Sequence, residues 1–392
     1  MRYLILSTTF YLIGLTGIAG QTTWKPLFTE NISYSKSGNC TIDQHLEDIL
    51  IGTEGDGAWI SLDEPYHDFM IEGEFLLNGQ NTAQLIFRLN DMKSKIPEIN
   101  GYAVQFDSDP DQQNCLGSII NVSRAVWVDS LNFEHWNSFK VRALGDHLQV
   151  FVADQLATET HSRRSIQGGI KIVMNGSGPI FRNLKISRLA ENQHLDGPAT
   201  EDYLQSYPEI EYKKIFDGKT LSGWHSTGSS EWKIVDGSLY GYSGTEGGFL
   251  ISDESYHNFH LKFKFKIIEE DNSGIFIRRP ETAEETSLLN SVECNIYDHN
   301  GYTHAYPTGA LVRHARSWYH MIDYDDWNTG EIFALNDHII MYINGRKSSE
   351  AHLADYDHPG QICLQAGLQL ALPEQGPSEV YFKDIWIKCI DQ

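Results

Sequence analysis

The sequence has few cysteines, few basic residues and few long apolar runs, and each of these shortages argues against a class of protein. Its 392 residues include five cysteines with no Cys-x-x-Cys pair, so neither a zinc ribbon nor a dithiol redox centre is indicated. After the first 20 residues no apolar run is long enough to span a bilayer. Lys and Arg number 30 against 53 Asp and Glu, a net charge of −23. These absences argue against a membrane span and against a nucleic-acid partner, which needs clustered basic residues.

The N-terminus has the composition of an export signal. Arg2 is followed by an apolar stretch from residue 3 to residue 18, and then by the small residues Ala19 and Gly20. This order predicts a signal peptide over residues 1–20 and a mature chain that is secreted or periplasmic.

Much of the chain occurs twice. Three segments return at a spacing of about 190 residues: Asp63–Phe69 as Asp253–Phe259, His135–Asn137 as Asp326–Asn328, and Gly145–His147 as Asn336–His338. A repeat of this length is a domain rather than a solenoid unit. We therefore expect a first copy over residues 21–189, a linker over 190–211 and a second copy over 212–392.

Period-two alternation dominates both copies. Residues 259–267 place Phe, Leu and Ile on one face and His and Lys on the other, which indicates a half-buried antiparallel strand. Residues 338–343 form another apolar run, and Asn344-Gly345 after it is typical of a hairpin turn. The fold class is therefore all-β, with two tandem jelly-roll β-sandwiches.

Three of the expected strands in the second copy carry polar residues at alternating positions. The alternation puts Phe276 and Arg278 on one face, and it puts Glu293 and Asn295 on the equivalent face of the next strand. Gln365 is the polar residue of a third strand. If the strands are neighbours, Arg278, Glu293, Asn295 and Gln365 form one polar cluster on a sheet face.

Several motifs in the second copy resemble those of a known family. They are the run Phe-Asp-Gly-Lys-Thr-Leu-Ser-Gly-Trp at 216–224, Asp-Asn-Ser-Gly at 271–274 with Arg278 after it, and the strand at 293–298. The sequence resembles the 3-keto-disaccharide hydrolase domain, which has a concanavalin-like jelly-roll fold. The resemblance covers about 212–390 well and the first copy more loosely. A His that commonly follows the family's Leu-Gln pair is absent after Gln365.

The resemblance implies cleavage of glycosides that are already oxidised to a ketone at C3. It implies Glu293 as the base that removes the C2 proton and Arg278 as the stabiliser of the developing oxyanion. A divalent metal ion is the alternative stabiliser, with ligands that the sequence does not identify, and no other cofactor is expected. The implied substrate-binding residues are Asn272, Asn295, Asp298, Gln365 and Trp327.

The first copy lacks part of this set. Arg88 and Gln105 correspond to Arg278 and Asn295, but Ala103 replaces the glutamate and Met174 is expected at the position of Gln365. We therefore expect only the second copy to be active, with the first as a support or binding module.

Two other functions stay open from sequence. The same fold serves non-catalytic, lectin-like carbohydrate-binding proteins, and the missing His and the missing acid of the first copy both favour that alternative. A weaker alternative is an interaction protein in which both sandwiches pack on a partner.

Several candidate residues also have structural interpretations. Arg278 and Glu293 could form a salt bridge, Asp298 could close a turn, Trp327 could be a core landmark, and Cys363 could be a disulfide partner or an inert thiol. A loop-rich segment with several histidines and acids could instead build a metal site: His299, His304, His314 and His320, with Asp323, Asp325 and Asp326.

Overall fold

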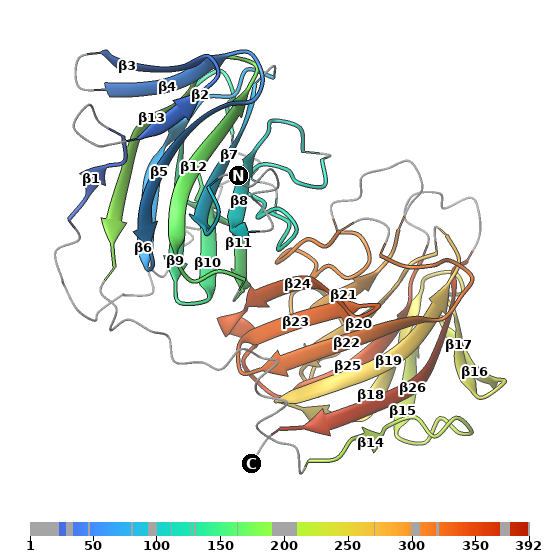
Figure 1. Cartoon of the computed structure of the whole chain (residues 1–392). Coiled ribbons are helices and arrows are strands. Elements are labelled where there is room, and N and C mark those ends of the chain that lie inside the picture. The colour runs from blue at the N-terminus through green and yellow to red at the C-terminus, as the bar shows by residue number, and fades with distance from the viewer. Residues whose placement is uncertain are drawn as a thin grey trace, which may run out of the picture.

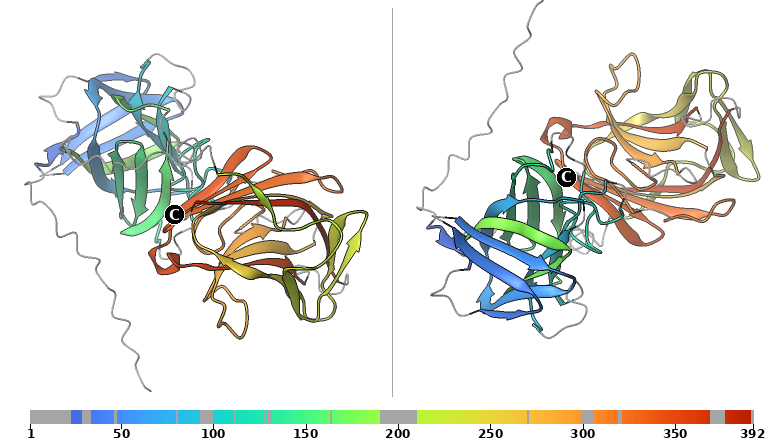
Figure 2. Two further views of the ribbon diagram at one scale, coloured as in Figure 1. Left: turned by 90° about the horizontal axis from the view of Figure 1, so that it is seen from below. Right: turned by 90° about the horizontal axis from the view of Figure 1, so that it is seen from above.

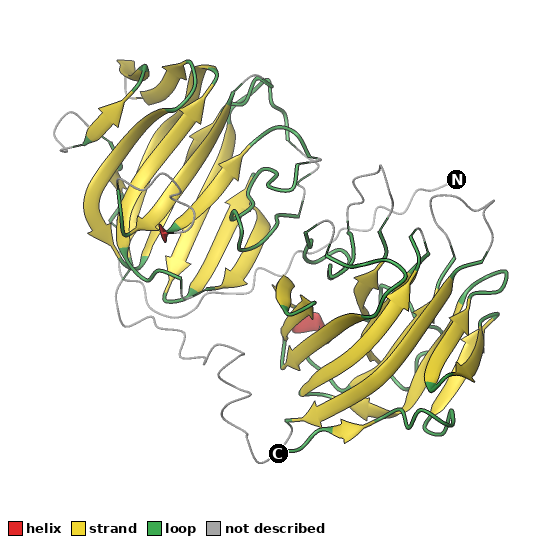
Figure 3. Cartoon of the chain, turned by 45° about the vertical axis from the view of Figure 1, so that its right-hand side comes forward, coloured by secondary structure: helices red, strands yellow, loops and turns green. Residues whose placement is uncertain are grey.

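The computed structural model describes residues 23–28, 34–45, 48–79, 81–92, 100–110, 112–126, 128, 131–162, 164–189, 210–269, 271–298, 306–318, 321–368 and 377–390. Its regular structure is almost entirely β-strand (Figure 3). The expected signal peptide at 1–20 and most of the expected linker at 190–211 lie outside these residues. Within them, no helix has the length and apolar character needed to cross a membrane.

The first copy forms two antiparallel sheets. The larger sheet has the order β11 (Gln155–His161), β10 (His147–Val152), β9 (Asn137–Leu144), β6 (Phe69–Phe75), β13 (Ser177–Arg188), β4 (Asp48–Glu54) and β3 (Cys40–His45), with β1 (Lys25–Pro26) also paired to β13. The smaller sheet has the order β2 (Ser35–Ser37), β5 (Ala58–Tyr66), β12 (Gly168–Asn175), β7 (Thr82–Leu89) and β8 (Tyr102–Phe106).

The second copy repeats this arrangement. Its larger sheet has the order β24 (Arg346–His352), β23 (His338–Ile343), β22 (Asn328–Leu335), β19 (Phe259–Ile267), β26 (Glu379–Cys389), β17 (Ser238–Tyr242) and β16 (Glu231–Val235), with β14 (Lys213–Lys214) paired to β26. Its smaller sheet has the order β15 (Trp224–Gly228), β18 (Gly248–Tyr256), β25 (Gly360–Ala366), β20 (Ser273–Arg279) and β21 (Val292–Ile296). A 3-10 turn, η1 (Ala354–Tyr356), precedes β25. The predicted all-β fold of two tandem sandwiches is confirmed (Figure 1).

The local signals read from sequence correspond to strands and turns of the structure. In β19 the apolar residues from Phe259 to Ile267 are buried on the inner face, while Lys262 on the other face is exposed. Asn344 and Gly345 both have positive φ, at 50° and 74°, as a tight hairpin between β23 and β24 requires.

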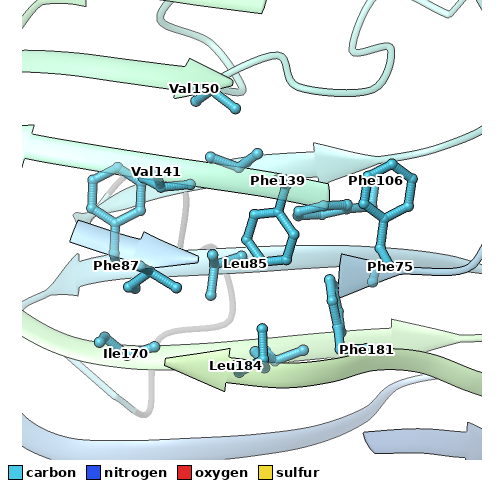
Figure 4. Packing of buried hydrophobic residues seen from close by; sticks show 14 of the residues in the cluster. Phe75, Leu85, Phe87, Phe106, Phe139, Val141, Val150, Ile170, Phe181 and Leu184 are labelled. Carbon is cyan, nitrogen blue, oxygen red and sulfur yellow. The ribbon is translucent and has the colours of Figure 1, made fainter. Parts of the chain in front are cut away.

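Each sandwich encloses its own apolar core. In the first, Phe106 makes edge-to-face contacts with Phe75, Phe139 and Phe181 at centroid distances of 4.9 to 5.3 Å (Figure 4). Inner faces of both sheets supply these rings, so the sheets are held together by burial of aromatic surface. The core of the second sandwich is a separate cluster. Each copy therefore has the apolar core that a domain requires.

The sandwiches meet through corresponding edges of their larger sheets. β11 of the first copy lies beside β24 of the second (Figures 1 and 2). A single antiparallel bridge joins Arg124 to Arg316, and Arg124 Nη1 donates to the carbonyl of Ser317 at 3.2 Å. Equivalent elements thus face each other, which is the geometry of an approximate twofold axis.

Candidate functional site

Three adjacent strands of the second copy bring the expected polar residues together. β20 lies between β21 and β25, and its Gly274 is opposite Asn295 on one side and Gln365 on the other. Glu293 is opposite Phe276, two positions further along. Because side chains two residues apart share a face, three of the four residues of the predicted cluster lie on one face: Glu293, Asn295 and Gln365.

Gly274 gives the cluster its geometry. A Cβ at this position would lie 3.2 Å from Glu293 Oε1 and 3.4 Å from Gln365 Oε1, so both side chains reach over the bare backbone of Gly274. Sequence reasoning did not assign this glycine a role. The available signal was a glycine inside an otherwise continuous strand, which often marks close approach of another group.

Glu293 sits in surroundings that disfavour its ionised form. The residue is 8% exposed, and among the described residues no side chain donates a hydrogen bond to its carboxylate. Desolvation therefore raises the pKa of Glu293 to about 7. A carboxyl group with this pKa can both accept and release a proton near neutrality, which is the property of a general acid or base.

Apolar and neutral groups line the same face. Phe276 packs against Phe249 at a centroid distance of 5.1 Å and also against Cys363. Burial raises the pKa of the Cys363 thiol to about 12, so it is not a nucleophile at neutral pH. Cys363 forms no disulfide with another described cysteine, which makes it the inert thiol of the two expected alternatives. Gln365 Oε1 is buried and has no hydrogen-bond partner among the described residues.

Arg278 is not part of the cluster, and the expectation that it shares a face with Glu293 is wrong. The register of β20 against β25 shifts between Phe276 and Arg279, and Arg278 adopts φ = 63°. This β-bulge turns the side chain into the sandwich. There its guanidinium donates to the carbonyls of His257, His358 (2.9 Å) and Asn336 (2.8 Å), joining three loops at one end of the domain.

The bulge places Arg279 next to Gln361, in the row that contains Cys363 and Gln365. Its guanidinium donates to Gln361 Oε1 at 2.5 Å and to Thr286 Oγ1 at 2.9 Å. Sequence reasoning missed this residue because a bulge cannot be detected from alternation alone.

Three further candidate residues hold loops in place. Asn272 Nδ2 donates to the carbonyl of Leu368 at 2.9 Å, and Asn295 Nδ2 donates to the carbonyl of Tyr306 at 2.5 Å. Asp298 Oδ1 accepts the backbone N–H of Thr308 at 3.1 Å, as the turn interpretation expects. These contacts position the segments that follow β21 and β25.

Trp327 lies on the other sheet. It directly precedes β22, and the ammonium of Lys383 from β26 lies 3.6 Å from the centre of its ring, with Lys266 of β19 further away at 5.9 Å. These lysines belong to the face of the larger sheet that is turned away from the core. The structure therefore does not bring Trp327 to Glu293.

The histidine-rich segment is only partly described. His299, His304 and His320 lie outside the described residues. His314 packs edge-on against Tyr356 at a centroid distance of 5.6 Å. The expected metal site in this segment stays untested.

The first copy has no carboxylate on the equivalent face. Ala103 is opposite Ile86, as Glu293 is opposite Phe276. Val173 is opposite Gln84, as Gln365 is opposite Gly274. The prediction that Met174 takes the position of Gln365 is therefore wrong by one residue. Met174 is instead buried in the core. On this face Ile86, Ala103 and Val173 form an apolar group, and Gln84 donates a hydrogen bond to Gln105 at 3.2 Å.

One protein-family model matches this chain twice, once over each sandwich. The family model of the 3-keto-alpha-glucoside-1,2-lyase-like domain matches residues 22–187 and 211–388. A 3-keto-disaccharide hydrolase of Bacteroides thetaiotaomicron is 28% identical over 170 residues, which cover 36% of this chain and 59% of the relative. The chain thus spans about three fifths of the length of that curated relative.

Solved structures with similar folds include two provisionally assigned glycosyl hydrolases of Parabacteroides distasonis, 19% and 24% identical, each with a TM-score of 0.38. They cover 50% and 46% of this chain and 99% and 100% of their own. A carbohydrate-binding module of Bacillus subtilis is 15% identical with a TM-score of 0.30, covering 42% of this chain and 95% of its own. Because the family model matches both sandwiches, the chain belongs to the family of 3-keto-alpha-glucoside-1,2-lyase-like domains and carries two of them in tandem.

Proposed function

We propose that the second sandwich cleaves glycosides that carry a ketone at C3, with Glu293 as the general base, and that the first sandwich is non-catalytic. The observation that carries the proposal is the buried Glu293 carboxyl group, with a pKa of about 7, on a polar sheet face of a domain in this family. The first copy has Ala103 at that position, so the same proton transfer is unavailable there. The expected signal at residues 1–20 would place the reaction outside the cytoplasm.

The chemistry needs a base close to C2. A ketone at C3 acidifies the C2 proton; Glu293 removes that proton, and the electrons of the broken C–H bond form an enolate. Collapse of the enolate expels the C1 substituent and leaves an enone, to which water adds to give net hydrolysis. Gln365 lies beside Glu293 over Gly274, and its amide N–H can donate to the ketone oxygen.

A divalent cation is compatible with one feature of this face. Within the described part of the chain, Gln365 Oε1 is a buried oxygen without a hydrogen-bond partner, and amide oxygens are among the ligands that hard cations accept. Gln365 would hold such an ion, which would supply Lewis-acid stabilisation of the enolate. Arg278 is excluded from that role by its bonds to three loop carbonyls.

A second candidate function is carbohydrate binding without cleavage. It is favoured by the surroundings of Glu293, since no cation of the described residues pairs with its carboxylate. The Arg279 guanidinium in the row of Cys363 and Gln365 is already bonded to Gln361 and Thr286, so enolate stabilisation would depend on neutral donors. A lectin-like protein would use the same polar and aromatic face to hold an intact sugar.

The two candidates differ in what happens to a 3-keto-glucoside. The mature chain is incubated with a chromogenic 3-keto-glucoside and with the unoxidised glucoside, with and without added Mg²⁺ or Mn²⁺. Release of the aglycone from the ketone alone supports the lyase proposal. Saturable binding of either sugar without release supports the binding protein, and neither binding nor release contradicts both.

The pKa of Glu293 sets an expected pH dependence. The base is active only when ionised, so kcat/KM should rise about tenfold per pH unit below pH 7 and level off above it. An initial-rate profile between pH 5 and pH 9 measures this. A profile that is flat from pH 5 upward would mean that the base has an ordinary carboxyl pKa and is not this residue.

A further inference from the structure

Six titratable side chains form a cluster at the junction of the two sandwiches, here called the interface cluster. They are His147, Glu159 and His161 of the first copy and His338, Glu350 and His352 of the second. Each residue of the first group has its counterpart 191 positions later in the second. The cluster lies on the edge strands β11 and β24 and on their neighbours β10 and β23 (Figure 1), and the proposed function does not use it.

Two imidazoles from different copies converge on one carboxylate oxygen. His338 Nε2 lies 2.7 Å from Glu350 Oε1, and His161 Nδ1 lies 3.1 Å from the same oxygen. The three ligand atoms are all within 4.8 Å of one another. Glu350 is 2% exposed, so these groups are held in a largely dry site.

This arrangement is close to the coordination shell of a tetrahedral metal ion. Zinc binds imidazole nitrogen and carboxylate oxygen at about 2.0–2.2 Å, which separates neighbouring ligand atoms by roughly 3.3 Å. The observed separations of 2.7 and 3.1 Å would need to widen by about 0.6 and 0.2 Å to reach that value. An ion that replaces the shared protons would therefore fit with small side-chain movements.

The ring orientations select these three ligands from the six side chains. His161 and His338 are inclined by 50° with centroids 5.0 Å apart, so both ring planes can contain one ion. His147 instead stacks parallel to His161, at 4.5 Å and 4°. An ion in the plane of one of these rings lies well out of the plane of the other, which excludes His147 as a third imidazole at this position.

A second observation indicates that the cluster lacks a ligand. His147 Nδ1 and His352 Nε2 are buried and have no hydrogen-bond partner among the described residues. Buried imidazole nitrogens are normally paired, so the cluster contains more nitrogen atoms than protein partners for them. Such a surplus is expected where imidazoles surround a metal ion and its bound water.

We propose that His161, His338 and Glu350 bind one divalent transition-metal ion of the zinc type, with water as the fourth ligand, and that the ion links the two sandwiches. Two histidines and one glutamate are a ligand set that zinc uses with three protein ligands and an open position. One ligand comes from the first copy and two from the second. The ion would therefore stabilise the contact between β11 and β24.

The surroundings of Glu350 favour binding through one carboxylate oxygen. Lys347 Nζ and Thr160 Oγ1 hold Glu350 Oε2 at 2.7 and 2.8 Å, which leaves Oε1 to face the imidazoles. A cavity of about 170 Å³ reaches the interface and is lined in part by Glu159, Glu350 and His352.

The test is metal binding by the full chain, freed of any affinity tag and stripped with a chelator. We expect one equivalent of Zn²⁺ to remain after gel filtration, and Co²⁺ to give the intense visible absorption of a four-coordinate site. The unfolding temperature should rise with the Zn²⁺ concentration, because the ion binds only the folded interface. Absence of a retained equivalent, together with a weak octahedral Co²⁺ spectrum, would overturn the proposal.

Matched variants locate the ion. His161→Gln and His338→Gln, one in each copy, should each weaken Zn²⁺ binding by more than about 100-fold. The control is His225→Gln, which removes an exposed histidine that is also paired with a carboxylate, Asp253, at 2.8 Å but lies outside the interface; its affinity should be unchanged. Affinity that is insensitive to both interface substitutions would also overturn the proposal. Turnover is not a readout, so this test is independent of the proposed function.

Discussion

Replacement of Glu293 by glutamine is expected to lower kcat/KM for a 3-keto-glucoside by about 10²–10⁴-fold, the usual contribution of a positioned general base. Glutamine keeps the size and shape of the side chain but cannot accept the C2 proton. The face around it, with Phe276, Cys363 and Gln365, should be unaffected, because among the described residues the Glu293 carboxylate accepts no side-chain hydrogen bond that could be lost. Initial rates at pH 8, with the substrate concentration varied, measure the effect.

Unfolding temperatures of the Glu293→Gln variant distinguish a catalytic role of Glu293 from a contribution to folding stability. The folded-state pKa of about 7 lies above the ordinary glutamate pKa of 4.5, so ionisation of this buried group weakens the native state as pH rises through that interval. Glu293→Gln should therefore raise the unfolding temperature by a few degrees at pH 8 and leave it nearly unchanged at pH 4. The control Glu246→Gln, at an exposed position of the same sandwich, should alter neither rate nor stability. Full turnover by Glu293→Gln would show that another group is the base.

Replacement of Arg278 by methionine should destabilise the second sandwich by about 3 kcal/mol, because the fully buried guanidinium is lost and three loop carbonyls lose their donor. For a domain of this size that is roughly a 10 °C fall in unfolding temperature. Turnover per folded molecule should change much less than in Glu293→Gln. Calorimetry and active-site titration of the same preparation measure both quantities.

The first copy supplies the matched control for this change. Arg88 has a φ of 51° and donates to the carbonyls of His67, at 2.7 Å, and Gly145, at 2.6 Å, as its counterpart does in the second copy. Arg88→Met should therefore destabilise the first sandwich and leave turnover intact. If Arg278→Met instead kept its stability and lost turnover, the original expectation of a catalytic arginine would be restored.

Much of the candidate face could be predicted from alternation. Glu293, Asn295 and Gln365 share a face because their strands are adjacent and have regular register. Arg278 breaks the pattern because one extra residue in β20 reverses which side the following residues occupy. Met174 was misplaced for a related reason, since the copies differ in spacing by a residue or two between some strands. Alternation predicts faces only while the period is uninterrupted.

Trp327 shows a different limit. Its neighbourhood in sequence resembles a landmark of the family, but the landmark lies on the larger sheet, where Lys383 covers the ring. Which of two packed sheets carries a residue depends on strand order, and strand order is a long-range property. No local pattern around Trp327 contains that information.

The sequence by itself determined the duplication, the all-β class and the strand that carries Glu293. The duplication follows from comparing two segments of the chain, and the strands follow from side-chain alternation, which depends only on neighbouring residues. The sequence also contained both halves of the interface cluster, since His147 and His338 lie within the repeated segments. Only the tertiary structure decided that His161 of one copy and Glu350 of the other meet within 3.1 Å. That contact depends on how two separately folded cores pack across an approximate twofold axis, and 189 residues of chain separate its partners.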